Sequence, residues 1–310
     1  MNSSSQRRAA LKKLKNLFFD TKSEVKDFRS KFDLTFSSPV LSNNVESVER
    51  AFSGVLCDVL SPELYNSKRV ILYVHGGCFV GGSKNAYRPF AASVATALSS
   101  RVILPEFRIA PTHPFPAALE DLQGVFRILY TEEVILRSLD GNSKSDEKDP
   151  QIIVMADGSG ASAALALVMS LTGRFRSSVK QVILFSPWLD VSADSAKFTA
   201  KKCGDELFTA EAMQRCAELY TFQNNRSNPL VSPLKATKEQ LKGLPPVYIQ
   251  TGEKDFLLED AEKFERALAE AGVKCTLDVW KKMPAMFELA DEFLEESHLA
   301  VEKLGQIFGV

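Results

Sequence analysis

The sequence predicts an α/β fold, with a mostly parallel central sheet covered by helices on both faces. From residue 51 onward, short apolar runs alternate with segments whose apolar residues recur every three or four positions. This alternation is typical of strand–helix–strand units, in which the helices pack on both sides of a parallel sheet. At 310 residues the chain can bury one large core, or one core with a small cap.

The individual elements follow from these apolar patterns. The expected strands are Val55–Leu60, Val70–Val74, Arg101–Leu104, Ile152–Met155, Gln181–Phe185, Val247–Thr251 and Lys274–Trp280. The expected helices are Tyr87–Leu98, Ala117–Tyr130, Ser162–Leu171, Thr209–Tyr220 and Leu258–Ala271. The first two strands lie too close in sequence for a helical crossover, so we expect them to form an antiparallel hairpin at the sheet edge.

Residues 1–45, which precede this alternation, and residues 190–228, which interrupt it, are expected to form a small helical cap. Residues 1–45 begin with basic and apolar residues at helical spacing. Such a helix either lies on a membrane surface or packs on the protein body, and the acidic residues that follow favour packing. The division is therefore an N-terminal helical cap segment at 1–45 and a core at 46–310, with 190–228 as a cap insertion.

Composition and charge exclude several classes of function. Hydrophobic residues make up 45% and charged residues 25% of the chain, which is typical of soluble globular proteins. The net charge of -1 gives no reason to expect a nucleic acid as the main partner. The apolar runs are too short to cross a bilayer, and residues 1–15 lack the apolar stretch of a secretory signal. The five cysteines show no close-spaced metal pattern, so we expect reduced thiols, a cytoplasmic location and no metal or organic cofactor.

The most informative segment is the turn after the strand at Ile152–Met155. The chain continues as Ala156-Asp157-Gly158-Ser159-Gly160 into an Ala-rich helix. An α/β-hydrolase carries its nucleophile at such a turn, in the pattern Gly-x-Ser-x-Gly. The register set by the strand places Gly158 at the serine position, and glycine has no oxygen with which to attack a carbonyl. Glycine also relieves the strain of this turn, which costs a non-glycine residue roughly 1–3 kcal/mol.

A second motif follows the strand at Val70–Val74. The segment His75-Gly76-Gly77-Cys78 can point backbone N–H groups into a cleft, as in an oxyanion hole. Further motifs appear in order downstream. They are Glu106-Phe107-Arg108-Ile109-Ala110-Pro111, Ser186-Pro187-Trp188-Leu189-Asp190, Asn228-Pro229-Leu230-Val231-Ser232-Pro233-Leu234 and Gly252-Glu253-Lys254-Asp255. Together this ordered set resembles the hormone-sensitive-lipase family of α/β-hydrolases, which includes many bacterial carboxylesterases.

The resemblance implies an incomplete catalytic triad. Asp255 matches the acid that orients the catalytic histidine. The histidine is expected in a segment Met-Pro-His-x-Phe, where this chain has Ala285. The family histidine beside the oxyanion loop, here His75, is structural, and Cys78 replaces the third glycine of that loop. His298 lies several helical turns from the position a base must occupy, so we do not expect it to substitute.

These departures predict an impaired hydrolase that still binds a ligand. The N–H groups of Gly76, Gly77 and Ser159 are expected to converge on a small carboxylate or ester, aided by the helix N-terminus. Asp255, without a histidine, needs another partner. The plant gibberellin receptors are similar in having the same fold and a lost triad histidine.

Two alternatives remain open. Ser159 or Cys78 could act as a displaced nucleophile in an active ester hydrolase, although we expect the Ser159 hydroxyl to cap the following helix and the Cys78 thiol to be packed. Alternatively, the chain is a structural or interaction protein with a vestigial cleft. A pocket filled by side chains would favour this last hypothesis, whereas a roomy pocket would favour ligand binding. The resemblance also suggests a possible homodimer through the last strand and helix.

Overall fold

The computed structural model describes residues 3–20, 22–38, 41, 44–66, 68–139, 150–192, 209–291 and 293–309. Residues 193–208 of the expected cap insertion lie outside these ranges. The strands are β1 (Val45–Phe52), β2 (Val55–Pro62), β3 (Arg69–Val74), β4 (Arg101–Pro105), β5 (Gln151–Asp157), β6 (Val179–Phe185), β7 (Val247–Gly252) and β8 (Cys275–Trp280). The α-helices are α1 (Ser3–Leu14), α2 (Val25–Phe36), α3 (Lys84–Ala97), α4 (Ala117–Leu139), α5 (Gly160–Ser170), α6 (Gly173–Ser178), α8 (Ala210–Tyr220), α9 (Lys238–Leu241), α10 (Leu258–Glu270) and α11 (Glu295–Phe308). Short 3₁₀ turns are η1 (Lys15–Leu17), η3 (Gln223–Asn225), η4 (Pro233–Lys235) and η5 (Phe287–Ala290).

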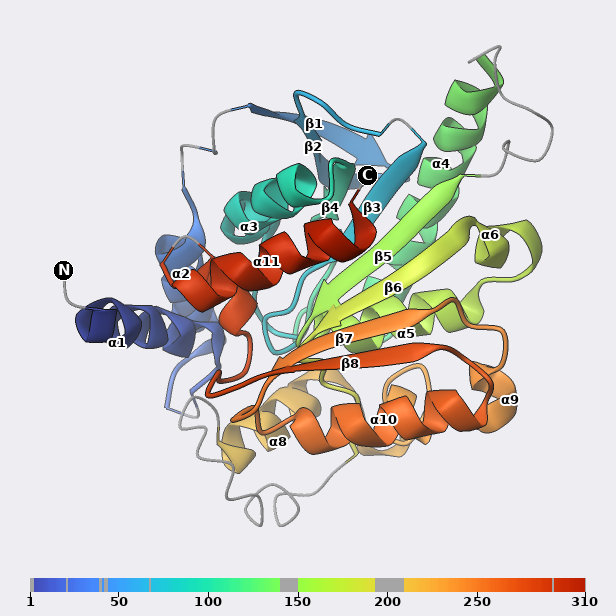
Figure 1. Cartoon of the computed structure of the whole chain (residues 1–310). Coiled ribbons are helices and arrows are strands. Elements are labelled where there is room, and N and C mark those ends of the chain that lie inside the picture. Colours follow the sequence, from blue (N-terminus) through green and yellow to red (C-terminus); the bar gives the residue numbers. More distant parts are fainter. Residues whose placement is uncertain are drawn as a thin grey trace.

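The central sheet has the order β1-β2-β4-β3-β5-β6-β7-β8, and its strands from β4 to β8 run parallel (Figure 1). The α/β fold is therefore confirmed. The predicted hairpin of the first two expected strands is wrong. β2 pairs antiparallel with β1 and β4, whereas β3 pairs parallel with β4 and β5. Strand β1 was missed because it is a charged edge strand whose residues are mostly exposed, so it has no apolar run.

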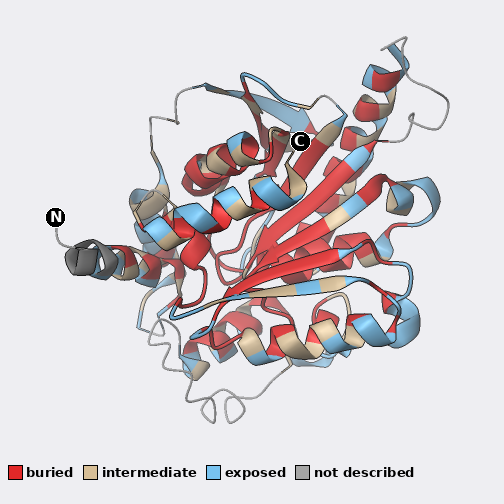
Figure 2. Ribbon diagram, viewed as in Figure 1, coloured by how far each residue is buried: buried red, intermediate tan, exposed pale blue. Residues whose placement is uncertain are grey.

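The central strands β3 to β7 are largely buried on both faces, as a parallel sheet requires, whereas the edge strands β1 and β8 are more exposed (Figure 2). Along β3, Ile71 and Tyr73 face one core, and Val70, Leu72 and Val74 face the other. Helices α3 and α11 cover the first face together with α2, and α4, α5 and α10 cover the second. The first core also contains residues of α1, η1 and α8. The N-terminal segment therefore packs its apolar side chains on the protein body.

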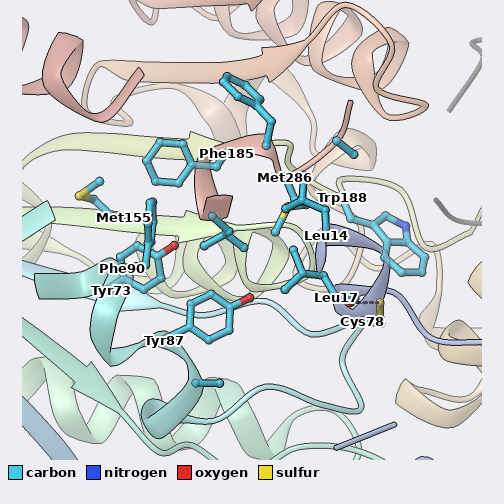
Figure 3. Close-up of a cluster of buried hydrophobic side chains, with 14 of the residues drawn as sticks. Leu14, Leu17, Tyr73, Cys78, Tyr87, Phe90, Met155, Phe185, Trp188 and Met286 are labelled. Atoms are coloured by element: carbon cyan, nitrogen blue, oxygen red, sulfur yellow. Dashed lines mark hydrogen bonds between the residues drawn. The ribbon is translucent and has the colours of Figure 1, made fainter. Parts of the chain in front are cut away.

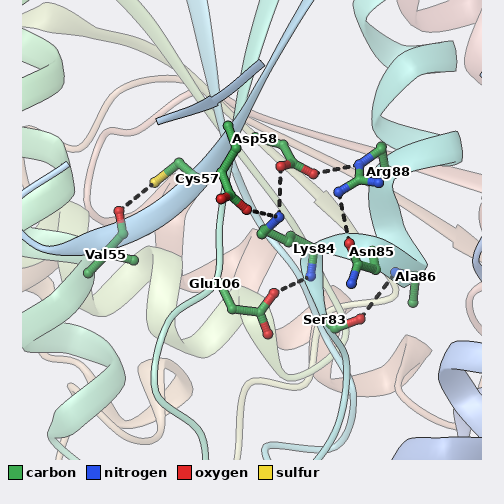
Figure 4. Close-up of polar contacts among 10 residues, drawn as sticks. Val55, Cys57, Asp58, Ser83, Lys84, Asn85, Ala86, Arg88 and Glu106 are labelled. Carbon is green, nitrogen blue, oxygen red and sulfur yellow. Dashed lines mark hydrogen bonds and ion pairs between the residues drawn. The ribbon is translucent and has the colours of Figure 1, made fainter. Parts of the chain in front are cut away.

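Residues 75–82, which follow β3 and contain four glycines, form the glycine-rich loop. An ion cluster fixes the start of α3 immediately after this loop (Figure 4). Asp58 on β2 is buried and accepts from Lys84 Nζ at 2.9 Å and from Arg88 Nε at 2.6 Å. The backbone N–H of Lys84 donates to Glu106 Oε2 at 2.7 Å, and Ser83 caps the helix by accepting from the Ala86 N–H. This cluster holds α3 in a fixed position relative to the sheet.

Helix α2 is tied to the glycine-rich loop by one arginine. Arg29 Nε donates to the carbonyl of Val80 at 2.7 Å, and its Nη2 donates to the carbonyl of Ala110 at 2.8 Å. We expect Arg29→Ala to lower the free energy of unfolding by roughly 1–3 kcal/mol, because hydrogen bonds from a charged donor are lost. Protease cleavage within the N-terminal segment should become faster. The exposed Lys26 lies on the same helix, so Lys26→Ala is the matched control and should behave like the native chain. Equal stability and cleavage rates for Arg29→Ala and Lys26→Ala would contradict this anchoring role.

Candidate functional site

The turn between β5 and α5 presents bare backbone at the position of the nucleophile. Gly158 has φ of +45°, in the left-handed region that favours glycine. Its N–H donates to the carbonyl of Phe185 at 3.0 Å, and its own carbonyl accepts from the N–H of Trp188 at 2.9 Å. A Cβ atom added here would lie 3.4 Å from both Sδ and Cε of Met286. The space above Gly158 is thus occupied by the Met286 side chain (Figure 3).

The histidine position is filled by a buried alanine. Ala285 is fully buried, and the backbone N–H of the next residue, Met286, donates to Ser186 Oγ at 2.8 Å. Met286 has φ of +60°, so it also adopts the left-handed conformation. In the part of the chain that the structure describes, His298 lies on α11 and contacts Asp291 at 2.9 Å, outside the candidate site.

Asp255 is held in place by hydrogen bonds from two neighbouring residues. It is buried, its Oδ2 accepts from Thr251 Oγ1 at 2.5 Å, and its Oδ1 accepts from the N–H of Leu257 at 2.7 Å. The carboxylate that lacks a histidine therefore has protein donors as partners. These bonds keep Asp255 in place at the end of β7, next to the residues that line the site.

The glycine-rich loop supplies backbone donors, but they differ from those expected. The N–H of Gly76 donates to Asp157 Oδ1 at 3.0 Å, so it is directed into the core and not toward a ligand. The N–H groups of Gly77, Cys78 and Ser159 have no acceptor among the described residues. These three residues line one cavity together with Gly158. Gly77 cannot carry a side chain, since a Cβ atom there would lie 2.2 Å from the carbonyl oxygen of Gly81.

The Ser159 hydroxyl is hydrogen-bonded to the glycine-rich loop and does not cap α5. Its φ and ψ of -69° and -24° are helical, and its side chain makes no hydrogen bond to the first turn of α5. Its Oγ accepts from the N–H of Phe79 at 3.0 Å. The expectation that this hydroxyl caps α5 is therefore wrong, because the loop approaches closely enough to use it instead.

Two tyrosines that sequence reasoning missed hold Asp157 beneath the loop. Asp157 accepts from Tyr73 Oη at 3.0 Å and from Tyr87 Oη at 2.7 Å, in addition to the Gly76 N–H. Burial raises the pKa of Asp157 to about 7, although these hydrogen bonds act in the opposite direction. The tyrosines sit in apolar patterns on β3 and α3, which gave no signal of a polar role.

His75 supports the loop from below. Its Nδ1 lies 2.8 Å from the carbonyl of Gly76, and its ring stacks on Phe107 with 4.3 Å between ring centroids. Burial lowers the pKa of His75 to about 4, so the ring is neutral near pH 7. Nδ1 is then the donor to the carbonyl.

The cavity above the turn is small and largely filled by side chains (Figure 3). Its apolar wall comprises Leu17, Phe18, Tyr87, Trp188, Phe256, Leu257 and Met286. It leaves about 20 Å³ for the centres of water-sized molecules, which is room for roughly one water. Leu17 and Phe18 come from the N-terminal segment. Their insertion into the site could not be read from the sequence, where they belonged only to a general amphipathic pattern.

The described residues contain no group of three or more His, Cys, Asp or Glu side chains that could hold a metal ion. None of the helices that the structure describes is both long and apolar enough to cross a membrane.

Comparison with known proteins places these features in a family. A family model described as an alpha/beta hydrolase fold matches residues 71–289. The chain is 28% identical over 237 residues to an acetyl-hydrolase of Streptomyces hygroscopicus, covering 76% of this chain and 74% of the relative. It is also 28% identical over 242 residues to an esterase of Acinetobacter venetianus, covering 78% and 75% of the two chains. A crystal structure of an esterase from the bacterial hormone-sensitive lipase family superposes with a TM-score of 0.83, at 26% identity and over 99% of this chain and 98% of that one.

Proposed function

Because the chain belongs to the α/β-hydrolase family, among the carboxylesterases related to hormone-sensitive lipase, we propose that it is a member that no longer hydrolyses esters. The observation that carries this proposal is the pair Gly158 and Ala285, at the positions of the nucleophile and the base. Acyl transfer by such an enzyme needs a hydroxyl to attack and a base to take its proton. Loss of a triad member leaves only about 10³–10⁴-fold catalysis over water, which binding and the oxyanion hole supply.

We further propose that the retained donors bind a small carboxylate or ester without cleaving it. The N–H groups of Gly77, Cys78 and Ser159 line one cavity at the N-terminus of α5, where the helix dipole favours negative charge. The cavity has room for only about one water-sized group, such as one oxygen of a carboxylate. A larger ligand requires Leu17 or Met286 to move.

The filled cleft supports a second candidate function. Leu17, Phe18 and Met286 line the small cavity above Gly158 and leave little room for a substrate, as expected of a structural or interaction protein with a vestigial cleft. Titration of the ¹⁵N-labelled chain with acetate and butyrate distinguishes the two. Saturable shifts of the Gly77 and Cys78 amide signals support ligand binding, and unchanged signals support the vestigial cleft.

We propose that the N-terminal segment at 1–45 and the insertion at 190–228 together form the cap. Helix α8 of the insertion contacts the N-terminal segment through Arg215, whose Nη1 donates to the carbonyl of Ser23 at 3.3 Å. The Arg215 guanidinium also lies over the Phe19 ring, 4.9 Å from its centroid. These contacts connect α8 to the N-terminal segment and support this proposal. The expected homodimer and cytoplasmic location remain predictions.

The native chain should hydrolyse p-nitrophenyl butyrate no faster than its Ser159→Ala variant, and a fluorophosphonate probe should label neither protein. The physical reason is that the Ser159 hydroxyl accepts a hydrogen bond from the Phe79 N–H and has no activating histidine at position 285. A purified esterase of the same family serves as the positive control. Turnover that disappears in Ser159→Ala, or fluorophosphonate labelling of Ser159, would overturn the inactive assignment.

A further inference from the structure

Two buried cysteines meet where the glycine-rich loop touches the cap. Cys78 belongs to the loop and Cys216 to α8, and both side chains are buried. The Cys78 thiol is among the groups that raise the pKa of the Cys216 thiol, as expected of side chains that lie close together. Cys78 Sγ also lies 3.6 Å from the carbonyl oxygen of Leu17, in the N-terminal segment (Figure 3).

Ring packing independently places the loop against this part of α8. The ring of Phe79, which follows Cys78, stacks on the ring of Tyr220 with 4.0 Å between centroids and an interplanar angle of 15°. Tyr220 lies about one helical turn after Cys216 on the same helix, and Met213 and Ala217 beside it are buried in the same core. Cys78 and Cys216 therefore lie in the same interface between the loop and the helix.

The two thiols differ in access. Cys78 lines the cavity above Gly158, which has room for one water-sized molecule, whereas Cys216 is fully buried. Burial raises the pKa of Cys216 well above its usual range, so its thiol is the poorer first nucleophile. Hydrogen peroxide is little larger than water and fits the space beside Cys78.

We infer that Cys78 and Cys216 form an oxidative modification site, at which a peroxide converts the two thiols into a disulfide between the glycine-rich loop and the cap. In the first step the Cys78 thiolate attacks a peroxide oxygen. The O–O bond breaks, and the products are Cys78 sulfenic acid and one water. In the second step the Cys216 thiol attacks the sulfenic sulfur and its proton passes to the leaving hydroxide, so the S–S bond forms and the second water is released. In sum, two thiols and one hydrogen peroxide give one disulfide and two waters, so the two electrons lost by sulfur reduce the peroxide.

The bond would lock the cap over the candidate site. It would join α8 to the loop that carries the unpaired N–H groups of Gly77 and Cys78, and it would remove the Cys78 thiol from the Leu17 carbonyl. A small thiol such as dithiothreitol would reverse it by thiol–disulfide exchange.

The test uses the full native chain treated with hydrogen peroxide, blocked with N-ethylmaleimide under denaturing conditions, digested and analysed by mass spectrometry. We expect the predominant cross-link to join Cys78 and Cys216. The melting temperature should rise and return to its original value with dithiothreitol, because a disulfide restricts the unfolded chain. Cys275→Ser is the matched control and should retain the cross-link, whereas Cys216→Ala should lose it and accumulate a Cys78 sulfenic acid that dimedone traps.

Three outcomes would overturn the inference. The first is that Cys78 is oxidised to the sulfinic acid while Cys216 is still alkylated by maleimide. The second is that Cys78 pairs mainly with another cysteine, Cys203 included. The third is that both thiols remain reduced while an exposed methionine or cysteine is oxidised. None of these outcomes depends on whether the Cys216→Ala variant folds, because each is measured in the native chain.

Discussion

Replacing three residues, with Gly158→Ser, Ala285→His and Met286→Gly together, should convert the chain into an ester hydrolase. We expect its activity on p-nitrophenyl butyrate to exceed that of the native chain by at least about 100-fold, well below the ~10⁶-fold that a fully oriented triad contributes. The serine fits because a Cβ atom at position 158 meets only the end of the Met286 side chain, at 3.4 Å. The third change removes that side chain, and glycine suits the φ of +60° at position 286.

The acid of the restored triad is already in place. Asp255 is buried and fixed by Thr251 and Leu257, so a histidine at 285 can use it as its orienting partner. The same triple variant carrying Asp255→Asn is the control and should lose most of the gain. Gly158→Ser alone should remain inactive, since no base can deprotonate the serine. A triple variant that folds but neither turns over substrate nor reacts with fluorophosphonate would show that the cavity is closed to esters.

The sequence alone predicted those features of the site that depend only on which residue stands at a given position. Strand-to-helix register alone placed Gly158 at the turn, where it has a positive φ. Order and spacing of the motifs implied the family, which the comparisons confirm. A missing hydroxyl or imidazole can be read from a sequence because no arrangement of the surrounding residues supplies it. Each expected strand and helix overlaps an observed one, because apolar periodicity is a local property of a segment. Charged β1 carries no apolar signal and was not expected, and α2, α6, α9 and α11 were not among the expected helices.

What the sequence could not provide depends on contacts between distant segments. Gly76 was expected to serve a ligand, yet its N–H is used by Asp157, 81 residues later in the chain. Ser159 was expected to cap its own helix, yet it accepts from Phe79. Leu17 fills the cavity from the N-terminal segment. For Gly76 and Ser159 the local sequence was compatible with the predicted partner, but the folded chain brings a different partner within hydrogen-bonding distance.

Measured relative to its Asp157→Asn variant, the native chain should lose free energy of unfolding as the pH rises from about 4 to about 7. The pKa of Asp157 is raised by burial from 3.8 to about 7. Below pH 4 both the folded and the unfolded chain hold the proton. Between pH 4 and 7 the unfolded chain releases it while the folded chain keeps it, so stability falls, and above pH 7 both forms are ionised. The expected size is on the order of 4 kcal/mol, at about 1.36 kcal/mol per pKa unit.

Chemical denaturation of both proteins at several pH values tests this prediction. Asparagine keeps an oxygen for the Gly76 N–H and Tyr73 Oη and offers an N–H₂ group to Tyr87 Oη, so the variant should fold. Other buried groups also titrate in both proteins, among them Glu288, whose pKa burial raises, and His75, whose pKa burial lowers. The difference between the two curves therefore isolates Asp157. Tyr87→Phe removes a hydrogen bond that favours the carboxylate and should move the fall in stability to higher pH. If the stability difference between Asp157→Asn and the native chain were the same at pH 4 and pH 8, the pKa of Asp157 would be equal in the folded and unfolded chains, and its burial would not control its charge.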